Sequence, residues 1–130
     1  MSADIGLLSV VTPTIKCKYS AIQFHFHSPS EHLILGTSFP LEMHIVHTMA
    51  EGAPSDYIYT KAVVAVVFDD SKDIPSPFIE SLHADAPGTA CNVDLQGFIS
   101  TIPKRLFHYQ GSLTTPPCSE VVNWYSRSLF

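Results

Sequence analysis

Five of the seven histidines in this sequence fall between positions 25 and 47. The segment Gln23-Phe24-His25-Phe26-His27 alternates polar and aromatic side chains, which is the pattern of a β-strand with two different faces. Gln23, His25 and His27 then share one face, and the strand rise places the Cβ atoms of the two histidines about 6–7 Å apart. Two imidazoles at that spacing can bind one metal ion at about 2 Å each.

A second expected strand, Leu41–His47, offers a third nitrogen ligand. Glu42, His44 and Val46 share one face of it, while His47 lies on the other. Either histidine could complete the site, but Glu42 favours His44, because a ligating imidazole usually gives its second N–H to a carboxylate or a carbonyl. Gln23 could serve His25 on the first strand in the same way.

Three neutral imidazole nitrogens leave a tetrahedral Zn²⁺ with one open position for water, which is the arrangement of a catalytic rather than a structural zinc site. Such a metal can supply hydroxide near neutral pH. The alternative is that these histidines are structural or surface residues, as an isolated His-x-His pair more often is. The residue chemistry alone leaves both interpretations open.

The composition indicates one globular domain and excludes two classes of partner. The chain has 130 residues, 45% of them hydrophobic and 15% charged. Its formal charge of −5, with no run of Lys or Arg, argues against a nucleic-acid partner. The most apolar run, Ala62–Phe68, is far shorter than the roughly 20 residues that span a bilayer, so no membrane span is expected. The oligomeric state stays open.

Short apolar runs separated by Gly, Pro, Asp and Ser predict a mainly β fold with a few short helices, an α+β domain. Strands are expected at Ala21–His27, Leu41–His47, Ala62–Phe68 and Glu120–Tyr125, with a weaker one at Lys16–Ser20. Helices are expected at Pro75–His83, with Pro77 in the first turn, and at Leu95–Ile102. Loops are expected at Gly52–Asp56, at Asp85–Gly88 and around Pro116-Pro117, where a cis bond is an option.

The cysteines and the N-terminus say little about the compartment. Cys17, Cys91 and Cys118 are too few for a disulfide scaffold, and one disulfide with one thiol, or three thiols, are both open. Met1–Val11 has an apolar patch but carries Asp4 and no positive charge, so a secretory signal is not supported. The localisation is therefore not predicted, and an extracellular location stays open for a longer form.

Three long motifs together resemble the α-type carbonic anhydrase family. The first, Gln23–His32, is similar to the family's zinc strand in the forms with Ser-Pro-Ser after the second histidine, and the second, Pro40–His47, is similar to the strand of the third ligand. The third, Tyr109–Glu120 followed by Asn123-Trp124, resembles the active-site loop and the strand after it. The resemblance implies the central part of the family's twisted, mostly antiparallel β-sheet.

Carried over to this sequence, the resemblance implies that His25, His27 and His44 bind Zn²⁺, with Gln23 and Glu42 as their hydrogen-bond partners. The remaining histidines then have no metal role: His32 and His47 are expected in structural or supporting positions, and His83 and His108 at the solvated surface.

The resemblance also implies the groups that orient the nucleophile and the substrate. Thr114 matches the threonine that accepts a hydrogen bond from the zinc-bound hydroxide, and Glu31 matches the buried carboxylate that accepts from that threonine. A carboxylate can only accept, so it would fix the direction of the threonine hydroxyl. Thr115 would line the bicarbonate side, and an apolar wall for carbon dioxide would come from Val46, Val63, Leu113 and Trp124.

The implied reaction is the reversible, zinc-dependent hydration of carbon dioxide to bicarbonate, a lyase activity. The resemblance runs over residues 19–124, so the single domain 1–130 is expected to be a partial one, truncated at both ends and with reduced turnover. The alternatives are a non-catalytic carbonic-anhydrase-like binding or matrix module, and an inactive truncated product. Cys118 matches a cysteine that usually pairs with one near the N-terminus, for which Cys17 is the substitute to test.

Overall fold

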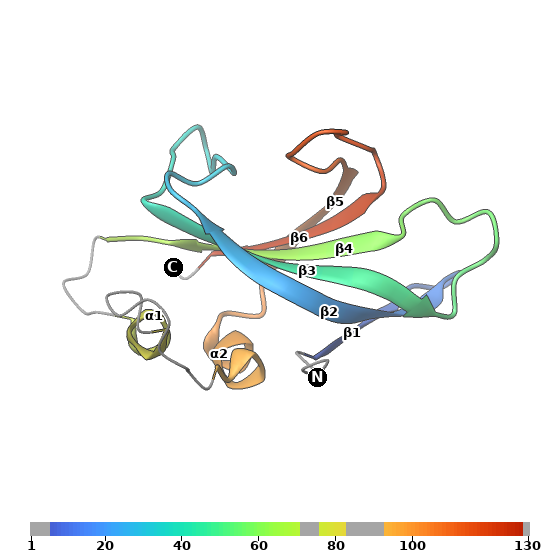
Figure 1. Ribbon diagram of the computed structural model, residues 1–130, viewed down its shortest axis with the longest axis horizontal. Coiled ribbons are helices and arrows are strands. Elements are labelled where there is room, and N and C mark those ends of the chain that lie inside the picture. Colours follow the sequence, from blue (N-terminus) through green and yellow to red (C-terminus); the bar gives the residue numbers. More distant parts are fainter. Residues whose placement is uncertain (1–5, 71–75, 83–92, 129–130) are drawn as a thin grey trace.

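Six strands form one twisted sheet in the computed structural model, which describes residues 6–70, 76–82 and 93–128. The strand order is β1-β2-β3-β4-β6-β5, and neighbours are antiparallel except for the parallel pair β4 and β6. The strands are β1 (Leu7–Val11), β2 (Lys16–His27), β3 (Leu41–Glu51), β4 (Lys61–Phe68), β5 (Leu106–Gly111) and β6 (Val122–Ser128). The expected fold, mainly β with a mostly antiparallel sheet, is confirmed (Figure 1).

The expected strands are all present, and two more strands complete the sheet. The weak strand at 16–20 is the first half of β2, which runs on without interruption to His27. β1 and β5 were not predicted, because β1 has only five residues and one face of β5 mixes polar and apolar side chains, Leu106, His108 and Gln110. Pairing with β2 and β6, respectively, holds these two edge strands in place.

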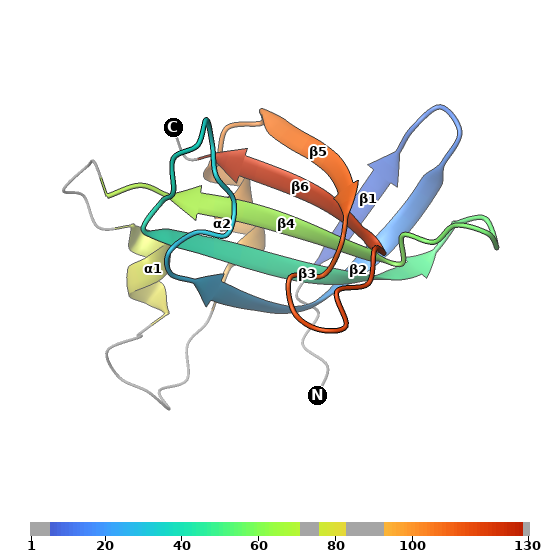
Figure 2. The ribbon, with the colours of Figure 1, turned by 90° about the horizontal axis from the view of Figure 1, so that it is seen from above.

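Two short helices, α1 (Pro77–Ser81) and α2 (Leu95–Thr101), cover one face of the sheet (Figures 1 and 2). Pro77 lies in the first turn of α1, as its fixed φ predicts. The side chain of Asp94 caps α2 by accepting a hydrogen bond from the Gly97 N–H at 2.7 Å. α2 ends at Thr101 because Ile102, which precedes Pro103, is extended.

The main core lies between the helices and the sheet. Met43 and Ile45 of β3 and Val66 of β4 pack there with Phe78 of α1 and Leu95 of α2. Two aromatic residues of β2, Phe24 and Phe26, pack against this same cluster, as the strand alternation predicts. Burial of one face of β2 and β3 against the helices therefore leaves their histidine-bearing face on the opposite side of the sheet.

The loops and cysteines settle several smaller expectations. The loop at 52–56 contains a turn in which Tyr57 N–H donates to the Pro54 carbonyl at 3.1 Å, whereas the expected loop at 85–88 lies outside the described residues. The Pro116–Pro117 bond is cis, and so is Ser28–Pro29, which was not expected.

Cys17 and Cys118 are both free thiols, so they do not pair, and Cys91 lies outside the described part. Within the described ranges, no helix is long and apolar enough to cross a membrane.

His47 is a buried histidine on the helix-covered face of β3, where it shares a small cavity of about 80 Å³ with Leu95 and Ile99 of α2. Its Nδ1 lies 2.9 Å from the Ile45 carbonyl. Burial lowers the pKa of His47 below its ordinary value, against the opposing effect of the backbone carbonyl.

We therefore expect His47 to make the fold acid-sensitive. A lowered folded-state pKa means that the unfolded chain takes up the proton first, so stability falls as the pH drops below the unfolded value of about 6.5. Urea unfolding between pH 7.5 and 5 should show a steeper loss for the natural chain than for His47→Gln. The exposed residue His108, changed to Gln, is the matched control and should follow the natural chain. Equal slopes for all three proteins would contradict this role of His47.

Candidate metal centre

The antiparallel register of β2 and β3 creates a cluster of three imidazoles. His25 lies directly opposite His44, and His27 lies two residues further along the same face of β2. The register between the strands shifts between Ala21 and Gln23, and the pairing is regular from Gln23 to His27. This regular stretch places the three imidazoles beside one another on the face opposite the helices.

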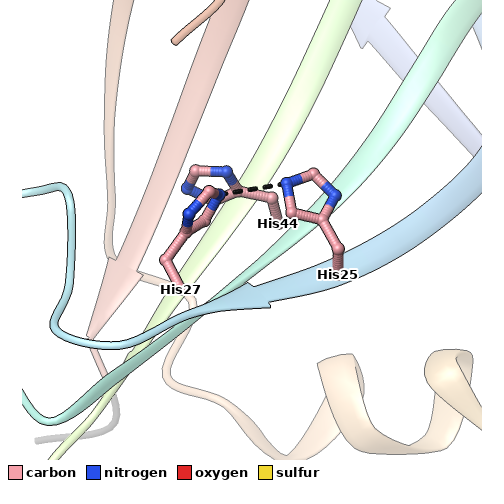
Figure 3. Close-up of side chains that lie close together, drawn as sticks. All are labelled: His25, His27 and His44. Atoms are coloured by element: carbon pink, nitrogen blue, oxygen red, sulfur yellow. Dashed lines mark hydrogen bonds between the residues drawn. The ribbon is translucent and has the colours of Figure 1, made fainter. Parts of the chain in front are cut away.

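The ring nitrogens of this cluster converge on one point (Figure 3). The Nε2 atoms of His25 and His27 lie 3.1 Å apart, and the ring centroid of His44 lies 5.3 Å from that of His25 and 4.6 Å from that of His27. One ligand atom from each of the three residues lies within 4.8 Å of the others. The cluster is buried at His44 and half-buried at the other two.

The donor set fits Zn²⁺. Two nitrogens bound to one tetrahedral zinc at about 2.0–2.1 Å lie about 3.3 Å apart. The separation of 3.1 Å between the Nε2 atoms of His25 and His27 is close to this value. Three imidazoles with no cysteine are a donor set typical of catalytic zinc sites, which keep a fourth position open.

His25 and His44 are each oriented by a hydrogen bond from the ring nitrogen that points away from the cluster. His25 Nδ1 donates to Gln23 Oε1 at 2.9 Å, and His44 Nε2 donates to Glu42 Oε1 at 2.7 Å. These bonds leave the lone pair on Nε2 of His25 and on Nδ1 of His44, the atoms available to a metal. The structure thus places Gln23 and Glu42 where the sequence predicted them.

Glu42 is the centre of a larger buried network. His32 donates to it from both its backbone N–H, at 2.8 Å from Oε2, and its Nδ1, and Tyr109 O–H donates to His32 Nε2 at 2.7 Å. Although burial opposes ionisation, the hydrogen bonds from His32 and His44 hold the pKa of Glu42 well below its usual range. His32, Glu42 and His44 also lie close enough to hold a metal, but both oxygens of Glu42 already accept hydrogen bonds.

Tyr109 is the one member of this network that received no role from the sequence. It opens the third motif, but its contact with His32 spans 77 positions along the chain, and no local pattern reports such a contact. His32 takes the supporting position expected of it.

The local environment favours the neutral form of His25. Burial lowers the pKa of His25 below its ordinary value, and the positive charge that His44 or His27 would carry when protonated lowers it further. Only a neutral imidazole can bind a metal, so a lowered pKa extends metal binding to more acidic pH.

An apolar cluster borders the imidazoles. Val63 and Trp124 are buried in it, and Val46 and Leu113 pack against them, so all four expected wall residues come together. The ring centroid of Trp124 lies 5.0 Å from that of His44. The indole N–H donates to the Ser112 carbonyl at 3.1 Å, which ties the loop at 112–119 to this wall.

The loop at 112–119 is held in a compact form by backbone hydrogen bonds. Leu113 N–H donates to the Ser119 carbonyl at 3.0 Å, and Cys118 N–H donates to the Thr115 carbonyl at 2.9 Å. Thr114 and Thr115 are exposed, and no hydrogen bond joins Thr114 to Glu31.

Glu31 therefore differs from its expected position as a buried partner of Thr114. It is exposed, and its carboxylate oxygens lie 3.6 Å from His27 Nδ1 and 3.9 Å from His44 Nδ1. The remaining histidines lie outside the cluster: His47 is on the opposite face, His108 is exposed and stacks on Tyr125, and His83 is not in the described part.

The comparison with protein families agrees with this geometry. The family described as "eukaryotic-type carbonic anhydrase" matches residues 8–128, a range that contains the three clustered histidines and the apolar wall. The chain belongs to the carbonic anhydrase family. The match extends on both sides of the range 19–124 in which the sequence motifs lie.

The alignments with individual relatives include most of this chain but less than half of each relative's length. A carbonic anhydrase from Neisseria gonorrhoeae is 41% identical over 111 residues, which are 82% of this chain and 40% of that protein. Alpha carbonic anhydrase 6 of Arabidopsis thaliana is 38% identical and is covered to 39%. The chain thus spans about two fifths of these carbonic anhydrases.

Solved structures show the same relation. The fungal α-carbonic anhydrase of Aspergillus oryzae superposes with a TM-score of 0.67 at 32% identity, covering 85% of this chain and 48% of that one. Dioscorin in complex with ascorbate superposes with a TM-score of 0.66 at 29% identity. Structures with different names therefore share a similar fold. Because the fold alone does not determine the function, the function has to be inferred from the residues of the site.

Glu42→Gln tests how far the buried network supports metal binding. The amide keeps an accepting oxygen but loses the charge that orients His44, and loss of such a partner typically lowers metal affinity about 10–100-fold. Competition with a chromogenic chelator measures the zinc dissociation constant. Glu51→Gln, the same change at an exposed position, is the control and should bind zinc like the natural chain. An unchanged affinity in Glu42→Gln would exclude this role.

Proposed function

We propose that this chain is a zinc-dependent carbonic anhydrase that hydrates carbon dioxide reversibly to bicarbonate and a proton. The observation that supports this most is the placement of His25, His27 and His44 directly beside an apolar wall. A neutral substrate without charge or strong dipole is suited to such a wall, and a polar nucleophile is suited to the histidine cluster. Both are needed on the same side of the sheet, and both lie there.

His25, His27 and His44 would hold Zn²⁺, which when bound lowers the pKa of a coordinated water and so supplies hydroxide near neutral pH. Gln23 and Glu42 keep the imidazoles of His25 and His44 directed at one point. The charge on Glu42 also offsets part of the positive charge of the centre, because it is buried against His44.

The substrate side of the site is assigned to the apolar wall and to two hydroxyl groups. Val46, Val63, Leu113 and Trp124 would exclude water and bind carbon dioxide beside His44. Thr114, the residue after Leu113, would accept a hydrogen bond from the nucleophile. Thr115 would donate to a bicarbonate oxygen. The partner for the Thr114 hydroxyl is proposed to be Glu31 once the carboxylate turns away from His27 and His44.

A non-catalytic binding module is the rival function, since a similar fold is found in dioscorin complexed with ascorbate. That rival needs no metal ligands, whereas this chain has three imidazoles with two dedicated hydrogen-bond partners. Catalysis is the better explanation for a donor set whose members are oriented in this way.

Stopped-flow measurement of carbon dioxide hydration with the zinc-loaded chain tests the proposal. We expect activity above the uncatalysed rate, and His44→Ala should lower it to that rate because two ligands do not hold the metal in place. His108→Ala removes an exposed histidine outside the cluster and should leave the activity unchanged.

The metal content of each variant separates the possible failures. A natural chain that binds one zinc but hydrates carbon dioxide no faster than His44→Ala would contradict the catalytic proposal and favour the binding module. Folded protein that binds no zinc would contradict the metal site as well.

A further inference from the structure

Tyr109 completes a closed chain of side-chain contacts that begins and ends at His44. Its hydroxyl donates to His32 Nε2 at 2.7 Å, His32 donates to Glu42, and Glu42 accepts from His44 Nε2 at 2.7 Å. On the other side, the ring centroid of His44 lies 5.0 Å from that of Trp124. Trp124 in turn stacks on Tyr109, with a centroid distance of 6.1 Å and an interplanar angle of 8°. Tyr109 therefore reaches the same histidine by one polar and one apolar route.

The hydrogen bonds of the polar route, from Tyr109 through His32 and Glu42 to His44, run in one direction. Glu42 keeps its charge and can only accept, so the proton on His32 Nδ1 points towards it. In the neutral form of His32 the other ring nitrogen, Nε2, then has a lone pair, and the Tyr109 hydroxyl donates to it. Burial and the nearby charges of Glu42 and Glu31 raise the pKa of Tyr109, which keeps this donor protonated. Each group on the route thus fixes the orientation of the next.

The ring of Tyr109 is held in place by its neighbours on the sheet. It lies directly opposite Trp124 in the pairing of β5 with β6. Gly111, two residues further along the same face of β5, leaves the space that both rings occupy: a Cβ there would lie 3.1 Å from Tyr109 Cε2 and 3.3 Å from Trp124 Cδ1. Carbon atoms in contact lie about 3.5–4.0 Å apart, so a side chain at this position would displace at least one of the rings.

The packing of Tyr109 needs only its ring, and phenylalanine would supply the same contact with Trp124. The hydroxyl serves a different purpose, because it is directed at His32, which holds Glu42 through both its backbone N–H and its ring. Outer partners of a metal ligand fix the orientation of its ring and raise its basicity. His44 is the most buried of the three clustered histidines, so its orientation depends on these neighbours rather than on solvent.

We propose that Tyr109 is a positioning residue for the metal centre: its hydroxyl, through His32 and Glu42, holds His44 with Nδ1 directed at the zinc ion. This inference rests on the zinc site of the proposed function but not on catalysis, because it concerns the affinity of the site for the metal. The edge strand β5 then contributes to the metal centre through a hydrogen bond rather than through a ligand.

The zinc dissociation constant of Tyr109→Phe, measured by competition with a chromogenic chelator, tests this. The variant keeps the ring and loses the hydroxyl, and its dissociation constant should rise about tenfold, the lower end of the range for outer partners of metal ligands. Gly111→Ala keeps the hydroxyl but displaces the ring, and it should also weaken zinc binding. Tyr57→Phe is the matched control. Its hydroxyl accepts a hydrogen bond of 2.8 Å from Asn123, which by strand alternation lies on the opposite face of β6 from Trp124, so this variant should bind zinc like the natural chain.

A double-mutant cycle with Glu42→Gln separates positioning from a general loss of stability. When the hydroxyl acts through Glu42, adding Tyr109→Phe to Glu42→Gln weakens zinc binding by less than about twofold more, because the route is already interrupted. A purely structural effect would add in full.

The outcomes for this inference and for the proposed function are distinct. An unchanged affinity in Tyr109→Phe, or fully additive effects in the cycle, would overturn the positioning role and leave the proposed function intact. A natural chain that binds zinc more tightly than Tyr109→Phe but does not hydrate carbon dioxide would contradict the proposed function alone. Folded natural chain that binds no zinc would overturn both.

Discussion

The register between β2 and β3 is the constraint on which the site depends. It pairs His25 with His44 across the two strands and, through the alternation of β2, places His27 beside them. A shift of one residue would turn the histidines of one strand towards the helices and the core residues towards solvent. The packing of Phe24, Phe26, Met43 and Ile45 against the helices makes that shift unfavourable, so the core fixes the position of the histidine cluster.

The polar network around the histidines gives the centre its chemical character. Glu42 is fully buried, and it stays charged because its oxygens accept hydrogen bonds from His32 and His44. Through His32 the same carboxylate is connected to Tyr109 on β5, at the far edge of the sheet. The buried carboxylate of Glu42 therefore orients His44 and, through His32, connects the edge strand β5 to the histidine cluster.

Much of this arrangement could be predicted because the relevant patterns are local. The alternation around His25 and His27 predicted that these residues share the face of the histidine cluster, and the position of Glu42 two residues before His44 predicted its hydrogen bond to that histidine. Contacts between distant segments carry no such pattern, as with Tyr109 and His32, or with Glu31, whose resemblance-based pairing with Thr114 is absent here. The two edge strands were missed because pairing with a neighbour, rather than their own composition, stabilises them.

The coordination of zinc in the loaded chain tests the central claim most directly. Extended X-ray absorption fine structure (EXAFS) at the zinc edge reports the type and number of the ligands and their distances from the zinc ion. Three imidazole nitrogens and one oxygen that exchanges with solvent, all at about 2.0–2.1 Å, are predicted for the natural chain, whereas His44→Ala should retain no ordered zinc. A fourth protein ligand such as the Glu31 carboxylate in place of the exchangeable oxygen would contradict the account, because it would leave no open position for the nucleophile.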